Sequence, residues 1–230
     1  MKISLFLILV LCPVLAFATD SNPPLEITAD KALEWNQTDK TYTAKGSAEA
    51  KQGEMSVKAD TLVANYAGAN GSTSDINLLT AIGNVVLTNG ANIATGDKVI
   101  YDLIKGEAIL SGTRPKIIQD GKNTLEADKI IVWTKNNILD RAEAIGNVII
   151  NNGEQTATGN KAIFTPQINM AELIGTVKIV QGKNILEGDK AEINLTTRVS
   201  KMIGQNGSGR VKGVFYTGQN KKEEAKKVSQ

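Results

Sequence analysis

Six acidic or amide residues recur along the chain in one short context, and their spacing raises the possibility of a metal site. Each follows an alanine or glycine and five precede a lysine; the six are Asp30, Asp60, Asp97, Asp128, Asn160 and Asp189. Carboxylate oxygens are ligands that calcium prefers. Each copy, however, offers at most one carboxylate, usually beside a cationic lysine, and Asn160 carries no charge. We therefore interpret the row as a polar ladder that serves turns, and we predict no metal and no cofactor.

The residue types that most enzymes use for acid–base and nucleophilic chemistry are missing. The chain contains no histidine, and its one cysteine, Cys12, lies in an apolar N-terminal segment. This excludes Ser-His-Asp and Cys-His nucleophiles, the usual His/Cys zinc sites and an intrachain disulfide. Glu34, Glu49, Glu54 and Glu187 occur in ordinary polar surroundings and form no recognisable pair for glycoside hydrolysis. We therefore predict that the protein is not an enzyme.

The composition is typical of a folded protein with an aliphatic core. Hydrophobic side chains make up 41% of the 230 residues, charged ones 22% and aromatic ones only 4%. Such a chain buries a core, which here must consist mainly of small and branched aliphatic residues. Lys and Arg number 26 against 24 Asp and Glu, a formal net charge of +2. That balance provides no electrostatic footprint for nucleic acid.

Residues 1–18 have the pattern of a secretory signal peptide. A basic residue, Lys2, precedes an apolar run that ends in an Ala-Phe-Ala sequence at Ala18. An uncleaved membrane anchor and a lipidated Cys12 are the alternatives, although the apolar run is short for a span of ~20 residues. We assign residues 19–217 to one domain and residues 218–230 to a disordered polar tail, because the tail lacks apolar periodicity.

The strongest signal in the sequence is an internal repeat. The six Asp/Asn positions lie 30, 37, 31, 32 and 29 residues apart. A second motif returns between them, centred on Gly46, Gly83, Gly112, Gly146, Gly175 and Gly204. Turn signals follow its first five copies, at Gln52-Gly53, Asn89-Gly90, Asp120-Gly121, Asn152-Gly153 and Gln181-Gly182. Each repeat unit is therefore predicted to form two strands, which gives at least twelve strands in all and essentially no helix. The segment Asn65–Asn77 is expected to be a loop insertion.

Side-chain parity predicts an irregularity at each Asp/Asn position. Apolar residues occur three positions before and two positions after it, as with Leu125 and Ile130 around Asp128. Because five is an odd number, a regular strand cannot point both residues inward. A bulge or corner would restore the face and bend the strand. We expect six stacked corners along one edge of a long, twisted β structure.

Parity also selects the residues that face the interior. They are Leu62, Val85, Leu87, Val99, Tyr101, Ile130, Val132, Val148, Ile150, Phe164, Val177, Ile179 and Ile193.

The repeated units resemble those of the OstA-like superfamily. The segments that carry the resemblance are Met55–Val63, Ile93–Leu103, Asn123–Trp133 and Leu173–Val180, and it extends from about Ile27 to Phe215. The resemblance implies an all-β, twisted and open-ended antiparallel β-jellyroll of two sheets, built from about six two-strand repeats. It also implies a periplasmic carrier of lipopolysaccharide, with lipid A acyl chains in an apolar groove. We expect about half of the thirteen inward residues to contact lipid.

The same resemblance implies head-to-tail stacking through edge strands. The edge residues that we expect are Ile27, Ala29, Ala32, Ile193, Leu195 and Val211. Such stacks would bridge an inner-membrane LptC-like component and an outer-membrane LptD-like component, and a head-to-tail homo-oligomer is a further expectation.

Other classes of protein stay open on the sequence. A structural β-repeat or adhesin-like protein would have the same strands around a closed, packed core. A membrane-anchored LptC-like component would keep its N-terminal segment, and an enzyme of the β-helix type ranks third. Co-purification of lipid would separate the carrier from the closed core.

Overall fold

The computed structural model describes residues 26–66, 76–135, 138–194, 196–197, 199–204 and 209–216. These residues form sixteen strands and one short 3-10 turn, Pro166–Ile168. The predicted all-β fold is thereby confirmed for the described part of the chain. The predicted signal peptide and polar tail lie outside the described residues. Both ends of the predicted loop insertion Asn65–Asn77 are strand, since β4 continues to Tyr66 and β5 begins at Ile76, and residues 67–75 lie outside the described residues.

The strands have the following bounds in chain order. They are β1 (Glu26–Thr28), β2 (Ala32–Asn36), β3 (Thr41–Gln52), β4 (Met55–Tyr66), β5 (Ile76–Asn89), β6 (Asn92–Asp102), β7 (Glu107–Ser111), β8 (Lys116–Gln119), β9 (Asn123–Glu126), β10 (Lys129–Lys135), β11 (Ile138–Asn151), β12 (Gln155–Thr165), β13 (Met170–Gln181), β14 (Asn184–Asn194), β15 (Val199–Ile203) and β16 (Lys212–Val214).

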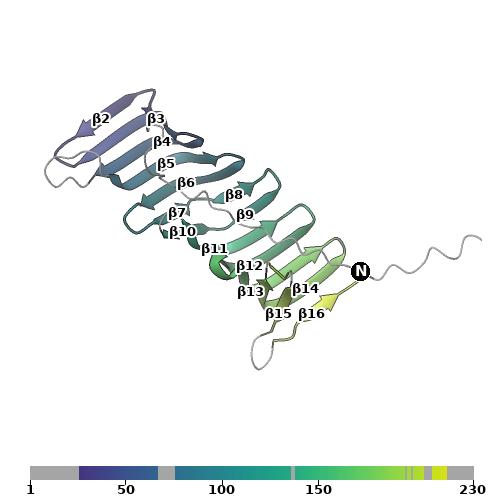
Figure 1. Ribbon diagram of the computed structural model, residues 1–230. Coiled ribbons are helices and arrows are strands. Elements are labelled where there is room, and N and C mark those ends of the chain that lie inside the picture. The colour runs from purple at the N-terminus through teal and green to yellow at the C-terminus, as the bar shows by residue number, and fades with distance from the viewer. Residues whose placement is uncertain are drawn as a thin grey trace, which may run out of the picture.

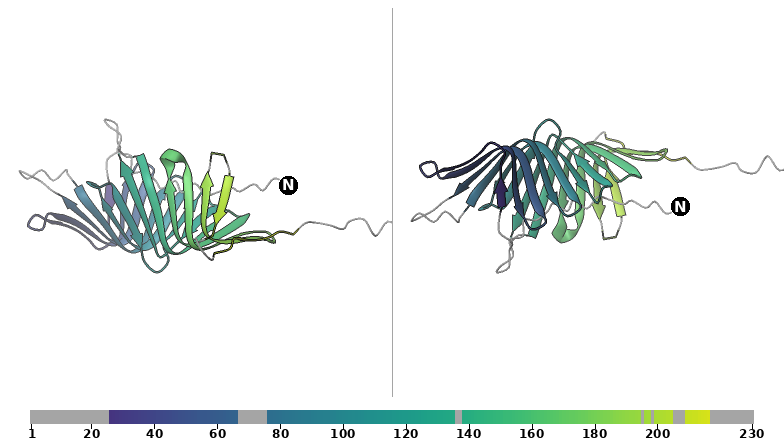
Figure 2. Two further views of the ribbon diagram at one scale, coloured as in Figure 1. Left: turned by 90° about the horizontal axis from the view of Figure 1, so that it is seen from below. Right: turned by 90° about the horizontal axis from the view of Figure 1, so that it is seen from above.

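All these strands belong to one antiparallel sheet that is folded lengthwise into two halves. One half, the β2 half, has the order β2-β3-β4-β5-β6-β7-β10-β11-β12-β13-β14-β15. The other, the β1 half, has the order β1-β3-β4-β5-β6-β8-β9-β11-β12-β13-β14-β16. Figure 1 shows the strands side by side along the molecule, and Figure 2 shows them bending from one half into the other. The two predicted sheets are thus the two halves of one continuous sheet.

The halves meet along a line of β-bulges, which we call the crease. In β5 the register against β4 and β6 shifts between Ile82 and Val85, so that Gly83 and Asn84 together oppose single residues, Asp60 and Asp97. Equivalent shifts occur in β3, β11 and β13. An extra residue on one strand bends it and increases its twist, which folds the sheet. The irregularity predicted at the Asp/Asn positions is confirmed, but the extra residue lies on the glycine strand.

Glycine is required at the crease for two reasons. Gly83 and Gly146 have φ values of +78° and +77°, a left-handed conformation that residues with a Cβ adopt only at a cost. A Cβ on Gly83 would lie 2.2 Å from Oδ2 of Asp60, and one on Gly146 would lie 2.1 Å from Oδ2 of Asp128. The two repeated motifs therefore pack directly against each other, glycine against aspartate.

The aspartates of the crease hold the bulges by hydrogen bonds. Asn84 donates from Nδ2 to Asp60 at 3.0 Å, and Asn147 donates in the same way to Asp128 at 2.9 Å. The backbone N–H and the hydroxyl of Thr113 both donate to Oδ2 of Asp97, at 2.6 and 2.8 Å, and they lower the pKa of that carboxyl. These contacts agree with the interpretation of the row as a polar ladder. Among the described residues, no three Asp or Glu side chains are close enough to hold a metal ion.

Candidate functional site

The candidate site is the apolar interior between the two halves of the sheet. All thirteen residues that parity placed inward lie there. Eleven are buried, and the other two, Leu87 and Ile150, are half-buried and pack against the buried core. Period-two alternation, corrected for the odd step at the crease, therefore identified this surface correctly.

Small side chains lie beside the crease in several repeats. Ala59 directly precedes Asp60, Ala81 lies two residues before Gly83, and Val85 directly follows the bulge; their exposed fractions are 4%, 1% and 1%. Larger residues, such as Tyr101 and Phe164, lie toward the free ends of the strands. Large residues also reach the crease, since Leu173 occupies the position before Gly175 that Ala81 occupies before Gly83, and it is 2% exposed. The space beside the crease is therefore filled by small side chains in some repeats and by large ones in others.

Among the residues that the structure describes, two apolar cavities lie in this interior. The larger, about 100 Å³, takes Leu87 and Ile117 from the β1 half and Tyr101 and Val132 from the β2 half. The smaller, about 40 Å³, lies farther along the molecule beside Phe164, and Ile130 contributes to the walls of both. Burial in this apolar environment raises the pKa of the Tyr101 hydroxyl. The interior is therefore an apolar, elongated space that side chains do not completely fill.

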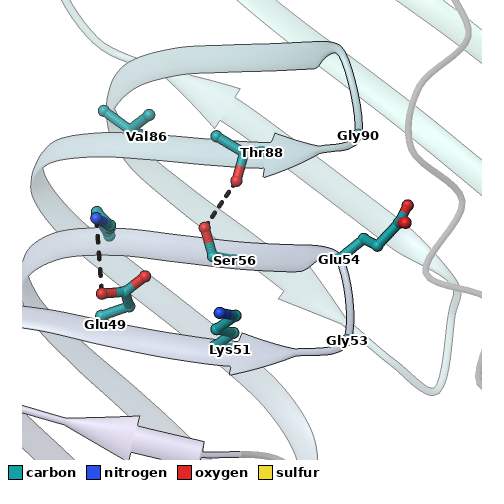
Figure 3. Close-up of a pocket in the computed structure, with 9 residues that line it drawn as sticks. Glu49, Lys51, Gly53, Glu54, Ser56, Val86, Thr88 and Gly90 are labelled. Atoms are coloured by element: carbon teal, nitrogen blue, oxygen red, sulfur yellow. Dashed lines mark hydrogen bonds and ion pairs between the residues drawn. The ribbon is translucent and has the colours of Figure 1, made fainter. Parts of the chain in front are cut away.

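A larger hollow, about 580 Å³, lies on the outer face of the β1 half (Figure 3). Its side chains are mainly polar, and several already satisfy one another. Lys58 lies 3.6 Å from the carboxylate of Glu49, and the hydroxyls of Ser56 and Thr88 are 2.7 Å apart. Such pairs are typical of a solvated sheet face, so this hollow is a weaker candidate than the interior.

The glutamates considered for catalysis do not form a site. Glu49 and Glu54 lie at the outer hollow, whereas Glu34 pairs with Lys45 at 3.7 Å on the other half of the sheet. Glu187 is beside Lys212 and Lys178, whose hydrogen bonds and positive charges lower its pKa. A general acid at neutral pH needs a pKa shifted upward. The arrangement of these carboxylates therefore offers no acid–base chemistry.

The described sheet ends in two unpaired edges, one formed by β1 and β2 and the other by β15 and β16. Ile27 lies in β1, Ala29 lies between β1 and β2, and Ala32 is exposed in β2, as expected of an edge. Val211 is 45% exposed directly before β16. These positions agree with the predicted edges.

One predicted edge residue is wrong. Ile193 lies in β14, which is paired on both sides by β13 and β15, and it is buried. The reason is that the chain after β14 provides two more strands, which the irregular sixth repeat concealed. Leu195 lies outside the described residues.

Apolar residues on the inner face of the terminal strands were missed in the sequence. Leu33 and Trp35 lie opposite Ala44 and Tyr42 of β3, yet they are 62% and 53% exposed. Phe215, directly after β16 at the opposite end, lies on the same side as Leu186 and is 50% exposed. Their alternation in β2 was the available signal, but alternation alone does not distinguish a covered strand from a terminal one. The apolar interior is therefore open at both ends.

The folded sheet, the apolar interior and the open edges together define an open-ended β-jellyroll. The chain belongs to the LptA/(LptD N-terminal domain) LPS transport protein family, because that family's model matches residues 26–137 and 116–199. The family consists of transport proteins and not of enzymes, which confirms the resemblance and the prediction of no enzymatic activity.

Comparison with solved structures finds LptH, the LptA homologous periplasmic component of the lipopolysaccharide transport device of Pseudomonas aeruginosa. The two sequences are 12% identical, and the alignment covers 85% of this chain and 96% of that chain with a TM-score of 0.25. No curated protein matches this chain. In the described part of the chain, none of the helical structure is long and apolar enough to cross a membrane.

Proposed function

We propose that this protein is a periplasmic carrier that binds lipopolysaccharide, with the acyl chains between the two halves of the sheet. The observation that carries the proposal is the larger cavity, whose walls from both halves are apolar and include Leu87, Tyr101 and Val132. Burial of each acyl methylene contributes about 0.8 kcal/mol, so a few chains bind without polar recognition. The cavity is smaller than a full chain, so binding must move these side chains or separate the halves.

The open ends favour transfer along a row of modules. The inner-face residues Leu33, Trp35 and Phe215 extend the apolar surface to the last strand at either end. Unpaired edge strands can add a strand from a neighbour by β-augmentation. The neighbours that we propose are a second copy, an LptC-like component and an LptD-like component. Each ladder hydrogen bond contributes a net ~0.5–1.5 kcal/mol, so short edges give reversible docking.

The proposed location follows from the sequence. Cleavage after Ala18 would release a chain that starts at Thr19 into the periplasm. Mass determination of the N-terminus after expression in a Gram-negative host tests this step, and a retained residue 1–18 segment would instead support the anchored alternative.

Photo-crosslinking of lipopolysaccharide to the folded chain tests the carrier function. A photoreactive residue replaces Phe164, which is 6% exposed in the interior, or Asp128, which is exposed at the crease. We expect adducts at position 164 and none at position 128. The absence of adducts at both positions, in protein with native circular dichroism, would refute the carrier and favour a structural β protein with a closed core.

A further inference from the structure

The hairpin turns of the β1 half, at the strand ends away from the crease, carry a row of carboxamide side chains, which we call the carboxamide rim. Its members occupy the first and last positions of successive turns. They are Gln52, Asn89, Asn92, Gln119, Asn123, Asn152, Gln155, Gln181 and Asn184. Two of these amides have structural partners, since Asn152 accepts the backbone N–H groups of its own turn and Asn184 accepts that of Tyr216.

The strand register brings the row together in space. Asn89 pairs with Asn92, Gln119 with Asn123, and Gln181 with both Gln155 and Asn184. The pair Ile93↔Ile118 continues by one step to place Asn92 beside Gln119. Met55, between Gln52 and Asn89, interrupts the row. The rim therefore runs along most of the length of the molecule.

The rim belongs to the interior and not to the outer face. Asn89 and Gln119 lie two residues beyond Leu87 and Ile117, which are walls of the larger cavity, so they point to the same side of the sheet. All nine side chains are at least partly buried, and Gln119 is only 9% exposed. The amides therefore form one lip of the apolar interior.

Two adjacent members of the rim have unsatisfied hydrogen-bonding groups. Oε1 of Gln119 and Oδ1 of Asn92 are buried and have no hydrogen-bond partner. Burial of an unpaired acceptor costs stability, and such groups are rare in native proteins. Asn92 and Gln119 lie two residues beyond Ala94 and Ile117, which line the larger cavity, on the side of the hairpin turns. Their unpaired oxygens are the polar atoms that a ligand in this cavity would satisfy first.

The opposite lip has a different chemistry. Four inner residues near the strand ends of the β2 half are aromatic, and aliphatic residues such as Leu79 and Leu139 lie among them. The aromatic ones are Tyr42, Tyr66, Tyr101 and Phe164. Tyr42 and Tyr66 have ring centroids 5.2 Å apart, and Tyr42 also stacks on Trp35. Asn77, in β5 of this half, carries a third buried carboxamide oxygen without a hydrogen-bond partner. An amphiphile in the interior therefore meets a row of amides on one side, and rings together with one such amide on the other.

We propose that the carboxamide rim binds the linkage region of an acylated amino sugar, where acyl chains join the sugar through amides and esters. This inference rests on the proposed carrier function and assigns the polar half of the same ligand. The two unsatisfied atoms are acceptors, so an amide N–H or a hydroxyl of the linkage region satisfies them as they stand. An ionised phosphate offers only acceptors, so it would bind here only after both carboxamides turned their NH2 groups toward it. Neutral amides also avoid the desolvation penalty that charges would incur at this apolar border.

The test combines Asn92→Leu and Gln119→Leu in the full chain and measures lipid binding and thermal unfolding. Replacement of unpaired amides by apolar groups of similar shape leaves the melting temperature unchanged or raises it. Loss of two hydrogen bonds to the ligand weakens binding of purified lipopolysaccharide about tenfold. Dephosphorylated lipid A loses affinity by the same factor. Palmitate, which lacks the amide and hydroxyl donors, binds the variant and the wild type equally.

The outcomes separate this inference from the carrier function. Failure of the wild type to bind either lipopolysaccharide or palmitate refutes the carrier. Normal binding of lipopolysaccharide by the double variant refutes the rim while the carrier stands. An equal loss for palmitate means that the substitutions altered the cavity itself, and it also overturns the inference. Thr88→Val, on the outer face beside the rim, is the matched control and leaves all three affinities unchanged.

Discussion

Substitution of a crease glycine provides the sharpest test of how the sheet is folded. In Gly83→Ala the new Cβ would stand 2.2 Å from Oδ2 of Asp60, on a residue with a φ of +78°. The left-handed conformation costs ~1–2 kcal/mol for a residue with a Cβ. Relief of the clash adds ~1–3 kcal/mol, as in overpacked cores. We therefore expect the free energy of unfolding to fall by ~2–5 kcal/mol.

Gly90→Ala is the matched control for this prediction. Gly90 also has a positive φ, +56°, but an added Cβ meets nothing within 4 Å. Only the conformational cost of ~1–2 kcal/mol should remain. Equilibrium unfolding in urea measures both variants, and an unchanged slope against denaturant shows that the folded and unfolded states are otherwise comparable. In an Asp60→Ala background, part of the cost of Gly83→Ala should disappear, since the clashing carboxylate is gone.

Equal destabilisation by Gly83→Ala and Gly90→Ala would refute the clash as a source of the cost. It would mean that the glycines of the crease are needed for their backbone conformation alone. The close packing of the glycine motif against the aspartate motif would then have no energetic role, and the alternation of the two motifs along the sequence would need a different physical cause.

Three further predictions concern the core, the crease and an edge. Ile130→Ala truncates a fully buried side chain that lines both cavities. It should lower the free energy of unfolding, measured by urea titration, by ~2–5 kcal/mol. A smaller loss would indicate that the surrounding side chains collapse into the enlarged cavity. The hydrogen bonds from Thr113 lower the pKa of Asp97 below its ordinary value of 3.8, so they stabilise the fold above pH 3.8, and this stabilisation is lost as the pH falls through the lowered pKa. Asp97→Asn should therefore be less stable than the wild type at pH 7. In thermal melts at acid pH, the difference in melting temperature between the two proteins should become smaller. Leu33 lies on the inner face of β2 and is 62% exposed, so Leu33→Asp should leave the melting temperature within a few degrees of the wild-type value. The substitution should weaken self-association in sedimentation experiments. Unchanged self-association would argue against this edge as a docking surface.

Local chemistry predicted much of the fold. The hairpin turns at Gly53, Gly90 and Gly182 have the positive φ that glycine provides, and their positions were evident from the sequence. Alternation predicted the inner surface because neighbouring side chains of a strand point to opposite faces, whatever lies beyond. The odd step at each Asp/Asn likewise indicated a bulge. These are properties of short segments, so they can be recognised one repeat at a time.

The edges of the sheet and the open ends of its apolar interior depended on the tertiary structure. Whether Ile193 or Trp35 is covered depends on which strands come after or before in the sheet, and no local pattern contains that information. The carboxamide rim could be recognised only when the strand register placed amides from several hairpins in one line. In the sequence, Asn and Gln beside a turn are interpreted simply as residues that form the turn. The sequence by itself determined strands, turns and the apolar face. Only the folded sheet decided where that face stays open and which polar atoms border it, because both result from pairing between residues far apart in the chain.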